Sequence, residues 1–97
     1  MAFFEMRRKA RGFVIIDVEP GKEREIAEKL MEYGEVKEVH VTPGEHDLIV
    51  VLEMEREIIT PPSEKMGRFV TDVISKIEGI QNTITITPSI SLAKSPK

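Results

Sequence analysis

The sequence contains no cysteine and no tryptophan, and aromatic side chains make up only 5% of its 97 residues. Without cysteine the chain forms no disulfide and offers no thiolate to a metal ion or to a covalent catalyst. No stretch reaches the roughly 18 consecutive apolar residues of a membrane-spanning helix, and the first residues lack a signal-peptide pattern. An apolar fraction of 40% and a charged fraction of 32% are typical of a folded domain. We therefore expect one cytoplasmic domain that does not bind a membrane.

The motifs of common enzymes are also missing. No serine lies in a G-x-S-x-G turn, and no glycine-rich loop of the G-x-G-x-x-G or P-loop type is present to hold phosphates. Glu45 and Asp47 lie two residues apart at a turn, a spacing that suits a paired acid and base but also two solvated turn carboxylates. We expect no enzymatic activity and no cofactor.

Charge is distributed unevenly along the chain. Residues 1–11 contain four basic side chains and one acidic one, whereas the whole chain has a net charge of −3. The remaining acidic part disfavours binding to a phosphate backbone, which needs many basic contacts. We expect residues 1–11 to be a basic tail, residues 12–92 the folded domain and residues 93–97 a second tail, with no direct DNA binding. A nucleic-acid arm at residues 1–11, or packing of Phe3 and Phe4 onto a partner, stays open.

Hydrophobic periodicity predicts the order strand, helix, strand in the first half of the chain. A run rich in β-branched residues at 13–18 ends at Pro20-Gly21, a turn signal. Apolar residues at helical spacing follow until Gly34, and strand-like alternation returns at 36–42.

The second half repeats this order. Residues 47–54 predict a strand, and Ser63 is a candidate helix N-cap after a double proline. Apolar positions at helical spacing then extend from Met66 to Ile77, and residues 83–87 alternate again. The order βαββαβ predicts a ferredoxin-like α+β sandwich, a four-stranded antiparallel sheet with two helices on one face. Its first and third strands are central and its second and fourth are edges.

Both central strands are apolar on both faces, but two helices can cover only one face. The other face would expose several large aliphatic side chains, a patch that soluble monomers rarely show. Burying about five of them yields on the order of 10 kcal/mol per subunit, against an association cost of ~4–15 kcal/mol. We therefore predict a homodimer packed sheet face to sheet face, unless the chain's own ends cover the patch.

The end of the chain fits an exchange between subunits. Pro88 cannot donate a hydrogen bond within a sheet, yet Ile90 and Leu92 continue the alternation beyond it. This pattern favours a strand that crosses to the partner. The residues predicted for the dimer interface are Val14, Ile16, Ile49, Val51, Ile90 and Leu92.

The densest polar cluster, residues 44–47, stands directly before the most apolar strand. Gly44 is expected to adopt a positive φ after Pro43, which exposes backbone N–H groups that can bind a carboxylate. Glu45 or Asp47 can bind an ammonium group, so the loop can hold both ends of an amino acid. Two readings stay open: exposed turn residues, or a metal site that adds His40 to this loop. The residues predicted for ligand binding are Gly44, Glu45, His46, Asp47, Thr83 and Thr85, and no metal is expected.

Residues 12–92 resemble the amino-acid-sensing domain of the Lrp/AsnC regulators. The resemblance is carried by GFVIIDVEPGKEREIAEKL, by GEVKEVHVTPGEHDLIVVLE with a G-x-x-D loop at 44–47, and by KIEGIQNTITITPSISL with a closing T-x-T pattern at Thr83 and Thr85. It implies a ferredoxin-like domain that dimerises through its sheet as a dimeric α+β barrel, often within rings of dimers. It also implies a small effector, usually an amino acid, bound between dimers.

Three features depart from the family. Residues 1–11 are too short for a helix-turn-helix, so the chain resembles a stand-alone sensing domain. His46 stands where the family often has tyrosine, which admits pH sensitivity near neutrality. The segment 55–63 is longer than usual.

Together these features predict a non-enzymatic effector-sensing and oligomerisation module. It would bind an amino-acid-like ligand between dimers and modulate helix-turn-helix regulators of its own family by co-assembly. Two alternatives are a small monooxygenase-like enzyme with the same dimeric α+β barrel, and a purely structural assembly domain. The enzyme would need polar side chains among the helix-facing positions, and the sequence has almost none there.

Overall fold

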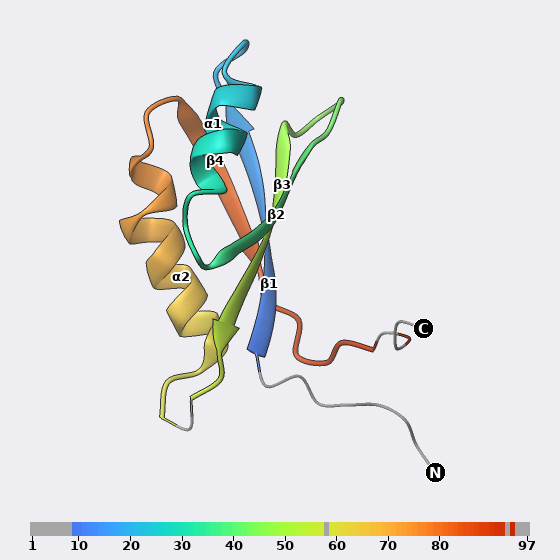
Figure 1. The fold of residues 1–97 in the computed structure, drawn as a ribbon, viewed down its shortest axis with the longest axis vertical. Helices are drawn as coiled ribbons and strands as arrows, with labels where there is room; N and C mark the ends of the chain where they lie inside the picture. The colour runs from blue at the N-terminus through green and yellow to red at the C-terminus, as the bar shows by residue number, and fades with distance from the viewer. Residues whose placement is uncertain (1–8, 58, 93, 95–97) are drawn as a thin grey trace.

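The computed structural model describes residues 9–57, 59–92 and 94. Its elements follow one another in the order β-α-β-β-α-β, which confirms the predicted ferredoxin-like α+β fold (Figure 1). In chain order the elements are β1 (Lys9–Val18), α1 (Glu23–Leu30), β2 (Val36–Val41), β3 (Leu48–Glu55), α2 (Pro62–Asp72), the short 3₁₀ helix η1 (Ile74–Lys76) and β4 (Ile80–Ile86).

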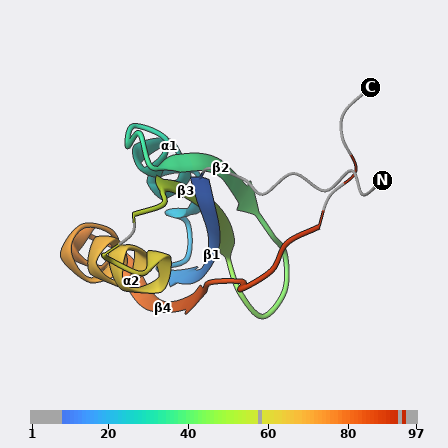
Figure 2. The same cartoon turned by 90° about the horizontal axis from the view of Figure 1, so that it is seen from below.

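The four strands form one antiparallel sheet in the order β2-β3-β1-β4. The two strands with apolar side chains on both faces, β1 and β3, are therefore central, as predicted. Both helices lie on one face of the sheet, and among the described residues no helix lies on the other face (Figures 1 and 2). No helix in the described part of the chain is long and apolar enough to cross a membrane.

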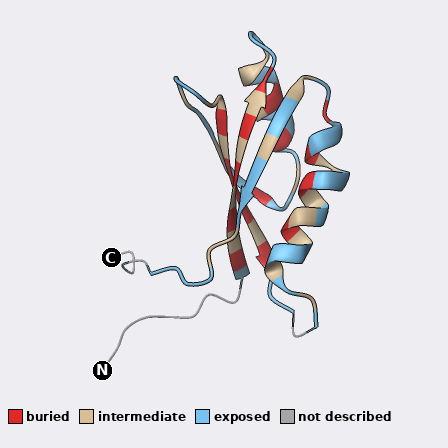
Figure 3. Ribbon diagram, turned by 180° about the vertical axis from the view of Figure 1, so that it is seen from behind, coloured by how far each residue is buried: buried red, intermediate tan, exposed pale blue. Residues whose placement is uncertain are grey.

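The core lies between the helices and the sheet, where the buried residues are concentrated (Figure 3). Side chains alternate along β1, so that every second residue from Ala10 to Val18 is buried. The largest fully buried side chains come from the central strands, from both helices and from η1. They are Val14, Ile16, Ile26, Leu30, Leu48, Val50, Leu52, Met66 and Ile74.

The strand register shows which residues face the helices. Val14 pairs with Val50 and Ile16 with Leu48, and Val14 and Ile16 are both 0% exposed in the core. The prediction that Val14 and Ile16 form a dimer interface is therefore wrong. A strand that is apolar on both faces gives no sign of which face the helices will cover, so the sequence could not settle this choice.

The face without helices has an apolar centre, which we call the open sheet face. Phe13 pairs with Val51 on one side and Ile86 on the other, and Ile15 lies between Ile49 and Ile84 in the same way. Ile84 and Ile86 on the edge strand are 43% and 46% exposed. The open sheet face consists of Phe13, Ile15, Ile49, Val51, Ile84 and Ile86.

Two predicted boundaries differ from the structure. Lys9 to Arg11 belong to β1, where they pair with β3, so they are not part of a tail. Helix α2 begins at Pro62 with Pro61 as its N-cap, so the prediction of Ser63 as the N-cap is wrong. Proline suits the first helical position because the N–H group there has no partner within the helix. Phe3 and Phe4 lie outside the described residues.

Candidate functional site

The loop between β2 and β3 is held together by hydrogen bonds within it. The Thr42 N–H donates to the Asp47 carbonyl oxygen at 2.9 Å, and the Thr42 hydroxyl donates to the His46 carbonyl oxygen at 3.0 Å. Gly44 has a φ of +124°, which confirms the positive φ predicted for it. These contacts give residues 44–47 a defined shape at one end of the sheet.

Asp47 ties this loop to the end of β1. Its N–H donates to the Ile16 carbonyl oxygen at 3.1 Å, and its Oδ2 accepts a hydrogen bond from the Val18 N–H at 2.9 Å. The register of β1 against β4 shifts between Asp17 and Val18, so this carboxylate supports the strand at an irregularity. Asp47 therefore has a structural role beside any role in binding.

His46 turns toward a different part of β1. Its Nδ1 lies 2.9 Å from Asp17 Oδ1, and both side chains are partly buried. This hydrogen bond to Asp17 is the main reason why the pKa of His46 is raised above its ordinary value, while partial desolvation opposes the rise. Asp17 follows Phe13 and Ile15 on the same side of β1 by strand alternation, so His46 lies beside the open sheet face.

A shallow groove of about 700 Å³ lies between this loop and the first turn of α1. Its charged side chains have both signs, because Arg24 lies there together with the carboxylates of Glu23 and Asp47. Arg24 Nε donates to Glu28 Oε1 at 3.2 Å, and Glu23 Oε1 accepts from the Gly21 N–H at 3.3 Å. The groove is lined by Glu23, Arg24, Val41, Thr42, Pro43, Gly44 and Asp47.

The sequence prediction included Gly44 and Asp47 but missed Glu23 and Arg24. In the sequence these two residues look like ordinary solvated positions at the start of an amphipathic helix. The turn Pro20-Gly21 was the available signal, because it starts α1 directly after β1 and so brings the first helical turn near the end of the sheet. Glu45 is exposed and does not line the groove.

The predicted threonines lie elsewhere in the single chain. Thr83 and Thr85 are on β4, where they pair with Ile16 and Val14. Thr83 lines a separate depression of about 150 Å³ beside η1. A common site with the 44–47 loop would therefore need a second subunit, and the binding role of all six predicted residues stays a prediction.

The two histidines do not converge on a common site. His40 Nε2 lies 2.9 Å from Glu38 Oε1 on β2, whereas His46 is held by Asp17. Across residues 9–57, 59–92 and 94, no three His, Asp or Glu side chains come together as metal ligands would. The core of this same part also contains no buried polar or charged side chain.

Comparison with characterised sequences places this geometry in a family. The model described as the Lrp/AsnC ligand binding domain matches residues 11–91. The HTH-type transcriptional regulator FL11 of Pyrococcus furiosus is 38% identical over 74 residues, which cover 76% of this chain and 44% of the regulator. FL11 of Pyrococcus horikoshii is 35% identical over 74 residues, which again cover 76% of this chain and 44% of the regulator. The chain thus spans less than half the length of these relatives.

Solved structures share this fold. FFRP-DM1 is 37% identical with a TM-score of 0.66, and the match covers 81% of this chain and 97% of that one. The hypothetical protein PHS023 from P. horikoshii is 35% identical with a TM-score of 0.67, covering 84% and 92%. E. coli AsnC shares the fold at a TM-score of 0.75 and 15% identity, covering 100% and 65%. The chain belongs to the Lrp/AsnC ligand-binding domain family, a regulatory domain of transcription regulators.

Proposed function

We propose that this chain is a non-enzymatic effector sensor that binds a small, zwitterionic, amino-acid-like ligand in the groove between the 44–47 loop and α1. The observation that carries this proposal is the pairing of charges in the groove. The Arg24 guanidinium offers donors to a carboxylate, and the carboxylates of Glu23 and Asp47 can accept from an ammonium group. The backbone beside Gly44 adds N–H donors at a turn where this residue itself carries no side chain.

A second subunit would complete this site. The groove is shallow and open to water, so one chain leaves much of a small ligand solvated. A neighbouring dimer that closes over the groove would bury the ligand, and Thr83 and Thr85 are candidates for the polar groups that it contributes. Effector binding and assembly would then be coupled, because each stabilises the other.

The dimer itself would form through the open sheet face, with a second copy of this chain as the occupant. Beyond β4 the chain leaves on the side of the sheet opposite the helices (Figures 1 and 2). This segment carries Ile90 and Leu92, which are 78% and 69% exposed. They are therefore available to a partner, as is the partly exposed Ile49 in the centre of the open sheet face, whereas Val51 beside it is only 5% exposed.

The same surfaces give a route to regulation. The relatives FL11 are named HTH-type transcriptional regulators, and they share the domain described here. We expect this chain to co-assemble with such regulators through matching sheet faces and to change their response to the effector. Rings of dimers follow if the groove-side contacts repeat around a closed symmetry.

Calorimetric titration of the twenty amino acids tests the ligand proposal. At least one should bind, and Arg24→Gln or Asp47→Asn should weaken that binding about tenfold or more through loss of a charge-assisted hydrogen bond. Asparagine keeps an oxygen that can accept from the Val18 N–H, so the loop should survive this change. Arg68→Gln is the matched control, because Arg68 pairs with Glu64 on α2 as Arg24 pairs with Glu28 on α1.

The titration has two outcomes that would overturn the proposal. One is that none of the twenty amino acids binds, in which case an oligomer indifferent to all of them would favour a structural assembly domain. The other is that Arg24→Gln and Asp47→Asn bind as tightly as the Arg68→Gln control.

A further inference from the structure

Both histidines of the chain lie along the open sheet face, and each is paired with a carboxylate. His40 pairs with Ile49 across β2 and β3, so its side chain stands on the same side as the apolar centre. His46 reaches Asp17 at the end of this side of β1. The two imidazoles are 55% and 35% exposed, so they sit at the rim of the apolar centre.

The other charged groups of this face belong to the same rim. Arg11 Nη2 donates to Glu38 Oε2 at 3.4 Å, and Arg11 Nε lies 3.5 Å from Glu53 Oε2 as an ion pair without hydrogen-bond geometry. Lys9 Nζ and Glu55 Oε1 lie 4.0 Å apart at the end of the strands, and their opposite charges cancel. Near His46, its own loop adds the acidic groups Glu45 and Asp47.

The charge of the face depends on the histidines. With neutral imidazoles, Lys9 and Arg11 oppose the four carboxylates of Asp17, Glu38, Glu53 and Glu55, which leaves two negative charges on each copy. Protonation of His46 halves this negative charge and turns the contact between His46 and Asp17 into an ion pair.

We propose that face-to-face association of this chain is gated by pH and tightens when His46 takes up a proton beside Asp17. This inference rests on the proposed dimer. Two copies in contact would bring two faces of net negative charge together in a medium of lower dielectric constant, where their repulsion grows. The dimer therefore binds more protons than two separate chains, and its dissociation constant rises as the pH rises through the titration of His46.

One feature of the single chain supports tighter association on protonation. Asp17 already raises the pKa of His46 before any partner is present. Because the pair is partly exposed at the rim, a second copy reduces the screening of its attraction by water without fully desolvating it. His46 lies beside the proposed dimer face, and its neighbour Asp47 lines the groove. The 44–47 loop therefore contacts both surfaces.

Sedimentation equilibrium of the full chain tests the proposal. The dissociation constant of the dimer should rise on the order of tenfold between about pH 6 and about pH 8. The double variant His40→Gln, His46→Gln should lose this dependence and stay near the weak, high-pH value. The double variant Asp17→Asn, Glu38→Gln should also lose it but stay near the tight, low-pH value, because it removes the negative charges instead.

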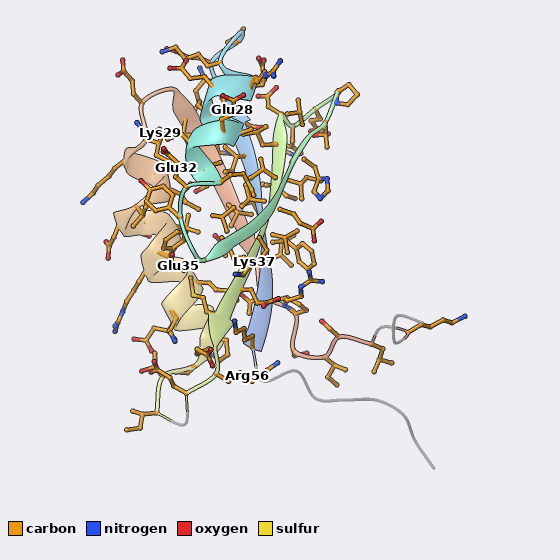
Figure 4. The ribbon with its side chains drawn as sticks, viewed as in Figure 1. Glu28, Lys29, Glu32, Glu35, Lys37 and Arg56 are labelled. Carbon is orange, nitrogen blue, oxygen red and sulfur yellow. The ribbon has the colours of Figure 1, made fainter. Side chains whose placement is uncertain are left out.

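A charge-matched control distinguishes the effect of charges on the open sheet face from the effect of the chain's net charge. Glu28→Gln with Glu32→Gln removes two negative charges from α1 and the turn after it, away from the open sheet face (Figure 4). This variant should keep the full pH dependence. Circular dichroism at each pH confirms that every variant is folded.

The possible failures can be told apart. A dimer whose dissociation constant is constant from about pH 6 to about pH 8 overturns the pH gate and leaves the proposed dimer standing. So does a histidine double variant that retains the dependence of the wild type. A particle of 11.0 kDa at every pH overturns the dimer and the gate together.

Discussion

Neighbouring residues of the 44–47 loop act on opposite sides of the strand ends. His46 lies beside the open sheet face through Asp17, whereas Asp47 lines the groove and binds the Val18 N–H. Asp17 and Val18 are themselves consecutive on β1. The link between the open sheet face and the groove therefore consists of two neighbouring contacts, His46 with Asp17 and Asp47 with Val18. A change at one side of this link is expected to reach the other through a single peptide unit.

Gly44 provides a test of backbone strain at this loop. Its φ of +124° is a conformation that L side chains rarely adopt, and a Cβ there would meet no atom within 4 Å. Gly44→Ala should therefore lower the free energy of unfolding by about 1–3 kcal/mol through strain alone. Gly67→Ala, inside α2 and equally free of neighbours, should raise it by about 0.5–1 kcal/mol. Urea unfolding measures both, and equal effects would contradict the assignment of strain to Gly44.

The His46–Asp17 pair predicts a pH dependence within one chain. Because the pKa of His46 is raised above 6.5 in the folded state, the pair's contribution to stability is complete below pH 6.5. It is lost as the pH rises through the raised pKa. The midpoint of thermal unfolding should therefore fall over this range, and less so in Asp17→Asn. An NMR titration should find a lower pKa for His46 in Asp17→Asn, and an unchanged pKa would show that Asp17 is not the cause.

At the scale of elements, the contact between β1 and α2 depends on the absence of a side chain at Gly12. A Cβ at this position would collide with Met66 Sδ, and the Met66 side chain is fully buried against the sheet. Helix α2 can approach the central strand here because glycine leaves room. The Thr87 hydroxyl contacts the same sulfur at 3.8 Å, so the chain beyond β4 closes the packing around it.

A double-mutant cycle tests this packing. Gly12→Ala should destabilise the chain by about 1–3 kcal/mol through overpacking, and Met66→Ala by about 2–5 kcal/mol through loss of buried volume. The double variant should cost less than their sum, because the shorter side chain at 66 leaves room for the new methyl group. Chemical denaturation gives all three values, and strict additivity would contradict the proposed contact.

At the scale of the whole molecule, the open sheet face is the feature on which the proposed dimer depends. Ile84→Glu places a charge on this face at a side chain that is 43% exposed, so the single chain should still fold. The dimer should dissociate to an 11.0 kDa particle at micromolar concentration, because a buried, unpaired carboxylate is costly. Met31→Glu is the control, since Met31 is 50% exposed but lies at the end of α1. Sedimentation of an Ile84→Glu dimer as stable as the control would contradict the interface.

The fold could be predicted from the sequence because its signals are local. Periods of two and of 3.6 residues identified the strands and helices, and the apolar residues on both faces of β1 and β3 marked them as central. The turn at Gly44 and the family were likewise readable from neighbouring residues. Each of these features depends on a short stretch of chain, whose side chains and backbone preferences are fully present in the sequence.

Tertiary structure alone decided how distant stretches meet. Strand alternation predicts that the side chains of Val14 and Phe13 lie on opposite faces of the sheet. Only the packing of the helices determines that Val14 is on the face they cover. The approach of Arg24 to the 44–47 loop and of His46 to Asp17 likewise depends on strand register and helix placement. These contacts join residues that are far apart along the chain, and their geometry is set by the whole core.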